Sequence, residues 1–292
     1  MIGLVQLLES VLTPLVIVFT ISNLASMGLQ SDLTRIVRAA GNLRFMGLVI
    51  PWGWLVGSVL GYLVTVVIPL DPVYATVVLL GSLASCAPFL PPMIAEAHGD
   101  IDFAGAFTPV AAIGTVLFMP LLAPVLVKGV TLGAAALAKP LVFSVLIPLL
   151  VGAAVRTYAT QAADRVFGPV KVLTGMTTLL TILGCSVLCG RRMLDTAGSS
   201  ALAPMTIFMV VLGLLPFGVG FGLERSQRTV TSLGMGTRNT AALFAGVLAI
   251  PDGDPRMMAM VVMWSVWSFI LALAIAPITG QRAGTAGAQG AA

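Results

Sequence analysis

Charged residues are the scarcest class in this sequence. They make up only 9% of the 292 residues, whereas 58% are hydrophobic and the mean hydropathy is +1.06. Soluble domains carry about 25% charged residues, so this scarcity excludes a soluble enzyme, and the hydrophobic excess excludes a disordered chain. Because a membrane-spanning helix needs about 20 apolar residues, the length allows roughly nine or ten spans. We therefore predict an all-α polytopic membrane protein.

Cysteines and catalytic motifs are also scarce. The three cysteines, Cys86, Cys185 and Cys189, form no Cys-x-x-Cys pair and lie in apolar stretches, which is typical of small buried side chains. No H-E-x-x-H or G-x-S-x-G motif is present in the sequence. We therefore predict neither an enzyme nor a resident cofactor. The net charge of +4 comes from scattered basic residues, which predicts no nucleic-acid partner.

The hydrophobic residues fall into nine segments when the chain is divided at charges and at Pro/Gly/Asp clusters. With the N-terminus outside, the inner loops would carry nine basic residues and the outer loops five, so the positive-inside rule favours an outer N-terminus and a cytoplasmic C-terminus. We expect a bacterial inner-membrane protein whose small, polar tail, residues 280–292, is disordered. The segments lie near residues 3–29, 45–68, 73–95, 103–127, 140–158, 168–189, 202–223, 230–250 and 257–278.

Two of these segments, the third and the eighth, are interrupted by polar or helix-breaking residues. Residues 81–97 contain three prolines in five positions, and residues 232–246 combine glycines with polar side chains. A matched pair of broken hydrophobic segments indicates the binding site of a transporter. We predict two inverted repeats, residues 1–127, which lack the first helix of the repeat, and residues 128–279.

One arginine, Arg238, lies inside a predicted span, where it costs about 2.5–3.5 kcal/mol on insertion scales. It is either a structural arginine bonded to backbone carbonyls or a buried carboxylate, or it faces a water-filled cavity, where it attracts an anion or replaces a cation. The polar neighbours Thr237, Asn239 and Thr240 favour the second interpretation, because so many polar side chains would be out of place facing lipid.

Further candidates for the lining of a substrate site lie outside this stretch. Ser85 precedes the proline-rich break, in which Pro88 and Pro91 either shape a site or only kink two packed helices. A helix that restarts after Pro91 and Pro92 would offer N-terminal amides to an anion. Asn23 faces either a neighbouring helix or the cavity, and Thr108 is the remaining candidate.

A short acidic stretch, EAHGDID, combines one histidine with three carboxylates, Glu96, Asp100 and Asp102. This composition resembles that of a metal site. However, Gly99 suggests a turn, and we interpret the stretch as a solvated loop. The presence of a metal stays open.

Three motifs, taken in order, resemble the bile acid:sodium symporter family. They are ASMGLQSDLTRIVR at residues 25–38, APFLPPM with the following AHGDID at residues 87–102, and GMGTRNTAAL at residues 234–243. The resemblance implies two inverted five-helix repeats that form a core and a panel domain, with two discontinuous helices crossing in the core. Nine-helix members lack the first helix. The resemblance also implies a secondary transporter that moves a small organic anion by alternating access, with membrane lipid as a further partner.

The sequence departs from the sodium-coupled members of this family at the expected ion site. Those members have a glutamate and a glutamine where this chain has Gly234 and Arg238, and glycines where it has Phe89 and Leu90. Sodium requires several hard oxygen ligands. We therefore predict that Arg238 takes the place of a cation and holds the anionic substrate. The alternatives are a sodium-coupled organic anion symporter, with Na⁺ as coupling ion, and a receptor-like protein that binds without transport.

Overall fold

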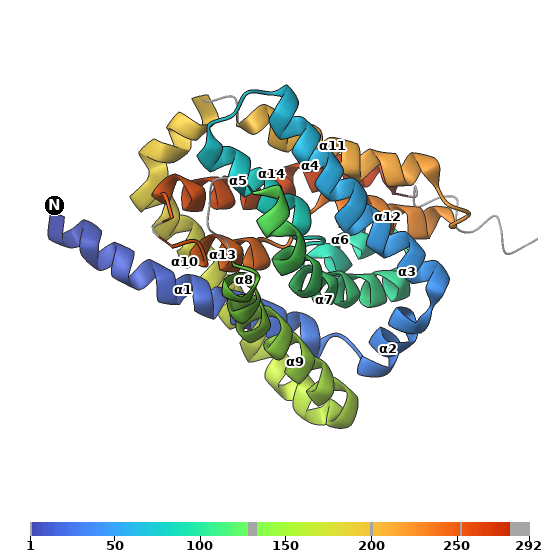
Figure 1. The fold of residues 1–292 in the computed structure, drawn as a ribbon. Helices are drawn as coiled ribbons and strands as arrows, with labels where there is room; N and C mark the ends of the chain where they lie inside the picture. Colours follow the sequence, from blue (N-terminus) through green and yellow to red (C-terminus); the bar gives the residue numbers. More distant parts are fainter. Residues whose placement is uncertain (1, 128–132, 199–200, 252, 281–292) are drawn as a thin grey trace, which may run out of the picture.

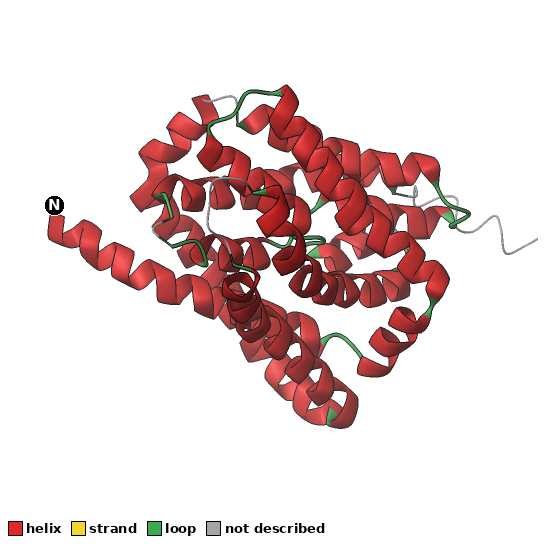
Figure 2. Cartoon of the chain, viewed as in Figure 1, coloured by secondary structure: helices red, strands yellow, loops and turns green. Residues whose placement is uncertain are grey.

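A computed structural model describes residues 2–127, 133–198, 201–251 and 253–280 of the chain, with side chains from residue 11 onward except for residues 188–200. The predicted disordered tail, from residue 281, and the side chain of Cys189 lie outside the described residues. Over the described ranges the protein is helical, and no strand is formed (Figures 1 and 2). This confirms the prediction of an all-α polytopic membrane protein.

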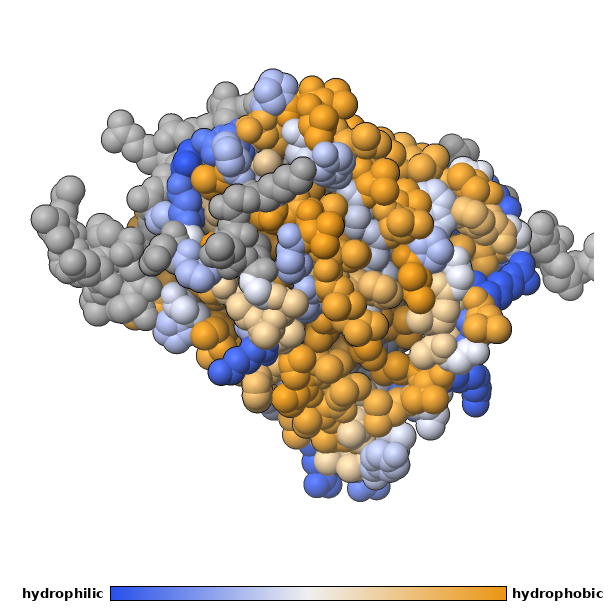
Figure 3. All heavy atoms as spheres, viewed as in Figure 1, coloured by the Kyte–Doolittle hydropathy of each residue, from blue (hydrophilic) through white to orange (hydrophobic). Residues whose placement is uncertain are grey.

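Within the described part of the chain, seven helical stretches are long and apolar enough to cross a membrane. Figure 3 shows hydrophobic side chains over most of one face of the molecule, with hydrophilic residues gathered toward its edges. The stretches are α1 (Ile2–Leu29), α3 (Leu43–Ile50) continued through the π-helical η1 (Pro51–Val56) into α4 (Gly57–Val67), α7 (Ile101–Leu126), α8 (Ala134–Leu141) continued through η2 (Val142–Leu146) into α9 (Ile147–Tyr158), α10 (Thr160–Gly198), α11 (Leu202–Val219) and α14 (Pro255–Thr279).

The other two predicted segments are each split into two short helices. The first consists of α5 (Pro72–Leu83) and α6 (Leu90–Glu96), and the second of α12 (Arg225–Gly236) and α13 (Thr240–Leu248). The predicted interruptions are therefore real.

One detail of the first break differs from the prediction. The helix α6 begins at Leu90, before the proline pair, so Pro91 and Pro92 occupy its first turn. Proline is tolerated there because the N–H it lacks would have no partner within the helix. Because the helix begins earlier than predicted, two positions of its first turn are prolines, which have no amide to offer an anion.

A further helix, α2 (Leu33–Gly41), lies between the first two predicted hydrophobic segments, where the sequence predicts a basic loop. Its N-terminus is capped by Asp32, whose side chain accepts a hydrogen bond of 2.7 Å from the Thr34 amide. Bonds from the Thr34 hydroxyl and amide lower the pKa of this carboxyl. Ile36 packs into the core, whereas Arg35 and Arg38 are exposed. The short length and high charge of α2 hide it from a search for hydrophobic spans.

The helices α1, α9 and α10 pack on one another beside the interrupted helices (Figure 1). The contact between α1 and α9 depends on two glycines that allow the backbones to approach closely. A Cβ atom at Gly152 would lie 2.7 Å from the Ala25 carbonyl oxygen, and one at Gly28 would collide with the Leu149 carbonyl. No larger side chain fits at either position without moving a helix.

We expect Gly152→Leu to lower the melting temperature, because the added side chain must push α1 and α9 apart at a cost of about 1–3 kcal/mol. The matched control is Gly168→Leu on α10, where nothing lies within 4 Å of an added Cβ. Thermal unfolding in detergent, followed by tryptophan fluorescence, measures both. Equal melting temperatures for the two variants would contradict the close contact.

Candidate functional site

The two helix breaks meet inside the protein, although about 150 residues separate them in sequence. Ser85 and Arg238 form an isolated antiparallel bridge. The Asn239 amide donates to the Ala84 carbonyl oxygen at 2.9 Å, and the Ala87 amide donates to the Thr237 hydroxyl oxygen at 3.3 Å. The structure thus joins the predicted residues Ser85, Thr237, Arg238 and Asn239 at one junction.

Backbone groups freed by the first break are satisfied by side chains from neighbouring helices. The Ser85 amide donates to the Thr115 hydroxyl of α7 at 3.1 Å, and Trp54 of η1 donates its indole N–H to the Leu83 carbonyl at 3.0 Å. Neither Thr115 nor Trp54 is among the predicted site residues. Their signal in the sequence is weak, because single threonines and tryptophans occur throughout the spans. These bonds stabilise the backbone of the non-helical segment between α5 and α6 in one conformation.

The polar residues beside Arg238 also support the second break. The Asn239 side-chain oxygen accepts from the Ala242 amide at 3.1 Å and so caps α13, while its Nδ2 is buried with no partner among the described residues. The Thr237 hydroxyl donates to the Leu233 carbonyl at 2.8 Å. Thr240 is the buried first residue of α13. These residues shape the backbone, which leaves Arg238 as the charged group of the junction.

Arg238 is completely buried, with an exposed fraction of 0%. None of its three guanidinium nitrogens has a hydrogen-bond partner within the part of the chain that the structure describes. Its Cζ lies 4.8 Å from the centroid of the Phe208 ring of α11, an arrangement typical of a cation–π interaction. The described residues therefore provide no carbonyl or carboxylate of the kind that a structural arginine would use. In this conformation no solvent reaches the side chain.

Further buried donors without a partner lie at the junction and on α14, which packs against α12 and α13. Besides Asn239 Nδ2, the buried indole N–H of Trp264 on α14 has no partner among the described residues. The Trp264 ring contacts that of Phe208 edge to face, at a centroid distance of 5.9 Å. Buried polar groups without partners are rare in proteins and call for a ligand, water or ion. A junction with several unused donors and a positive charge is chemically suited to an anionic acceptor.

The position of the family's expected carboxylate, Gly234, has no room for a side chain. A Cβ atom there would collide with the ring of Phe107 from α7 and would lie 3.1 Å from a methyl group of Leu90. Phe107 is fully buried. The space that an ion-binding side chain would occupy is therefore filled by an aromatic ring.

The remaining predicted residues lie on α1, on α7 and around the start of α6. Thr108 on α7 is buried, donates to the Ala104 carbonyl at 2.9 Å and interacts with the Cys86 thiol. Pro88 is half-buried just before α6, and Pro91 is in its first turn. Asn23 is half-buried on α1, and no described contact joins it to Arg238. Cys86 and Cys185 are buried free thiols.

The acidic stretch forms the turn before α7. Asp100 caps this helix by accepting a 2.8 Å hydrogen bond from the Phe103 amide, and Asp102 pairs with Arg35 at 2.7 Å. Glu96 and His98 are exposed. Over the described ranges, no group of three histidine, cysteine or acidic side chains is close enough to hold a metal ion. Asp100 therefore caps the N-terminus of α7, and Asp102 forms an ion pair with the basic helix α2.

The fold and the junction define a polytopic all-helical membrane protein in which two interrupted helices meet at a buried arginine. The model of the sodium bile acid symporter family matches residues 14–194, so this chain belongs to that family, as the motifs predict. The family is one of transporters. The match includes the first interrupted pair and ends before the second, which carries Arg238. A search of curated proteins gives no significant match.

Proposed function

We propose that this protein is a secondary transporter that moves a small organic anion across the membrane by alternating access, with Arg238 as its resident positive charge. The observation that carries this proposal is the complete burial of Arg238 without a hydrogen-bond partner in the described part of the chain. An isolated buried charge is strongly unfavourable. A transported anion would pair with the guanidinium and remove that cost during each cycle.

The chemistry of the junction supports an anion as the substrate. The unused groups, Asn239 Nδ2 next to Arg238 in the chain and the indole N–H of Trp264, whose ring contacts Phe208, are donors and not acceptors. A carboxylate or sulfonate offers several acceptor oxygens to such a set, and its bonds to a guanidinium are charge-assisted and bidentate. Because Arg238 is shut off from solvent, the substrate would reach it only after the helices around the junction move apart.

We further propose that transport does not depend on sodium bound near Gly234. The ring of Phe107 fills the space next to this glycine. The Leu83 and Ala84 carbonyls at the first break already accept hydrogen bonds from Trp54 and Asn239. A sodium ion needs several free oxygen ligands. The family as a whole is described by sodium symport, which makes a sodium-coupled organic anion symporter the second candidate.

The proposed architecture has two inverted repeats, residues 1–127 and 128–279, arranged as a core and a panel domain in a bacterial inner membrane. Contacts support the proposed grouping of the loops, because they join segments that the positive-inside rule places on one and the same face. Leu33 N donates to the Thr157 hydroxyl at 3.0 Å, and Asp100 N donates to the Ser226 carbonyl at 3.3 Å. On the proposed outer face, Arg256 pairs with Asp71 at 2.8 Å.

Ligand-induced thermal stabilisation, followed by uptake into proteoliposomes, tests the function. A panel of carboxylates and sulfonates is added to the purified protein in sodium or choline buffer. A ligand at about 100 times its Kd stabilises by roughly 2.7 kcal/mol, and we expect this effect for at least one anion in both buffers. The same anion should then accumulate in or exchange across vesicles without sodium.

Two outcomes would contradict the proposal. Saturable stabilisation by sodium, on which anion binding depends, would identify a sodium-coupled symporter. Anion binding without accumulation or exchange in vesicles would identify a receptor-like protein that does not transport.

A further inference from the structure

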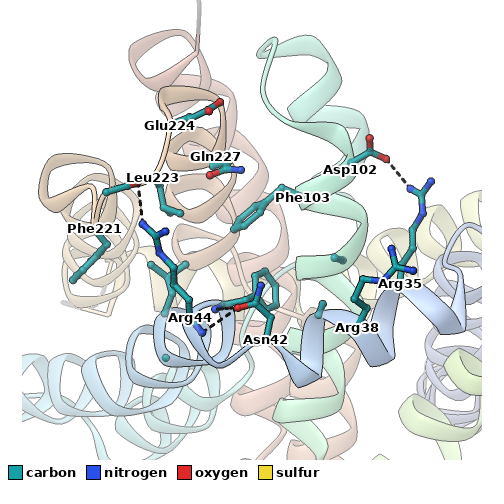
Figure 4. A pocket seen from close by; sticks show the side chains of 16 residues that line it. Arg35, Arg38, Asn42, Arg44, Asp102, Phe103, Phe221, Leu223, Glu224 and Gln227 are labelled. Carbon is teal, nitrogen blue, oxygen red and sulfur yellow. Dashed lines mark hydrogen bonds and ion pairs between the residues drawn. The ribbon is translucent and has the colours of Figure 1, made fainter.

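A basic cavity of about 960 Å³ lies at one end of the helices, away from the junction (Figure 4). The helix α2 and the start of α3 form one wall, the start of α7 forms another, and the turn from α11 to α12 forms a third. Its floor contains Phe45 and Phe103, whose rings lie 5.3 Å apart. Both rings also contact Phe107, the residue that packs against Gly234. This aromatic layer separates the cavity from the junction.

Three arginines, Arg35, Arg38 and Arg44, extend from the wall formed by α2 and α3 (Figure 4). Arg35 is neutralised by Asp102 at 2.7 Å. Arg38 has no recorded hydrogen bond or ion pair within the described residues, and Arg44 donates from its side chain only one long bond of 3.4 Å, to the Gly222 carbonyl. The guanidinium groups of Arg38 and Arg44 therefore keep most of their hydrogen-bond donors available for a ligand.

The wall formed by the turn from α11 to α12 carries Gln227 and the carboxylate of Glu224, on the same side of the cavity as Arg44 and away from Arg35 and Arg38 (Figure 4). Gln227 contacts Asp100, with its amide nitrogen 3.4 Å from the carboxylate oxygen. Arg38 and Arg44 thus place positive charge on two sides of the cavity, and Glu224 adds a carboxylate on the side of Arg44. An anionic group with a polar, neutral extension suits this distribution better than a compact anion does.

Exposed apolar side chains accompany the basic residues of this region. Phe221 lines the cavity and is 45% exposed, and Leu43, the first residue of α3, is 89% exposed. Val37, on α2, is 69% exposed. A short helix with exposed arginines and exposed apolar side chains is typical of the membrane–water boundary, where the former contact headgroups and the latter acyl chains. The volume is also far larger than an inorganic phosphate requires.

We propose that this cavity binds the headgroup of an anionic phospholipid from the proposed cytoplasmic leaflet. The phosphate accepts charge-assisted hydrogen bonds from Arg38 and Arg44, and the acyl chains leave past Phe221. Basic pockets between membrane helices on the cytoplasmic side commonly bind such lipids. Lipid binding at this cavity does not involve Arg238, so it can be tested separately from the proposed transport mechanism.

Short-chain lipids provide the test, with thermal unfolding of the full-length protein in a neutral detergent as the readout. Dioctanoyl phosphatidylglycerol is compared with dioctanoyl phosphatidylcholine and with glycerol 3-phosphate. We expect only phosphatidylglycerol to raise the melting temperature of the wild type. In Arg38→Gln/Arg44→Gln its apparent affinity should fall at least about tenfold, because two charge-assisted bonds are lost.

The matched control is Arg165→Gln, an exposed arginine near the start of α10 and outside the cavity, which should respond to phosphatidylglycerol like the wild type. Should the double variant not fold, Arg38→Gln alone serves, since Arg38 has no recorded partner in the described chain to lose. Equal stabilisation by phosphatidylcholine, or an unchanged response in the cavity variants, would overturn the proposal. Equal stabilisation by glycerol 3-phosphate would identify a site for soluble phosphates and overturn the lipid assignment.

Discussion

Arg238→Met is expected to make the ligand-free protein more stable while abolishing anion transport. Methionine has a similar length and can pack on the Phe208 ring, but it carries no charge to bury. Replacing buried charges by well-packed apolar side chains of similar volume is often stabilising, by about 1–4 kcal/mol. Anion-induced stabilisation and vesicle uptake should both fall to background, since the resident positive charge is lost.

The matched control for this variant is Arg256→Met, because Arg256 also lies over an aromatic ring, that of Tyr74, but is fully paired. Its guanidinium contacts Asp71 at 2.8 Å and Asp254 at 2.8 Å. The control should lose stability and keep transport, the reverse of Arg238→Met. If Arg238→Met lowered the melting temperature and left anion uptake intact, Arg238 would be a structural arginine.

Gly234→Glu, which introduces the carboxylate of the sodium-coupled family members, is expected to destabilise the protein without producing a sodium response. Any side chain at this position collides with Phe107 and crowds Leu90. Inserting atoms into a packed core costs about 1–3 kcal/mol, and the buried carboxylate adds a further penalty. Melting curves in sodium and in choline buffer should therefore be shifted downward equally.

A second substitution separates the steric effect from the electrostatic effect. Removal of the buried Phe107 ring is itself costly, so the comparison is a double-mutant cycle: we expect Gly234→Glu to cost less stability in a Phe107→Ala protein than in the wild type. Gly105→Ala is the control on α7, because nothing lies within 4 Å of an added Cβ there and alanine is the better helix former. A Gly234→Glu protein that melts like the wild type, or one that sodium stabilises, would contradict the close packing against Phe107.

The fold class and the positions of both helix breaks could be predicted from the sequence, because they depend on local properties. The length of an apolar run determines whether a helix can cross a membrane. Three prolines within five positions, at 88, 91 and 92, remove three backbone donors close together and interrupt the helix there, whereas α7 continues through its more widely spaced prolines. Arg238 is also recognisable in the sequence, since a charge in an apolar stretch is costly in any membrane fold.

The composition of the site depends on contacts between distant segments, which the sequence does not specify. Helix packing brings Thr115 to the Ser85 amide and places Phe107 in the space beside Gly234. It also leaves Arg238 without a hydrogen-bond partner over the described ranges. The same is true of the cavity near Arg38, which needs α2 to fold as a short amphipathic helix against α7. The sequence by itself determined the apolar spans, the two helix breaks and the presence of a charge, Arg238, within a span. Only the tertiary structure decided what surrounds that charge, because side-chain environments arise from the close packing of segments far apart in the chain.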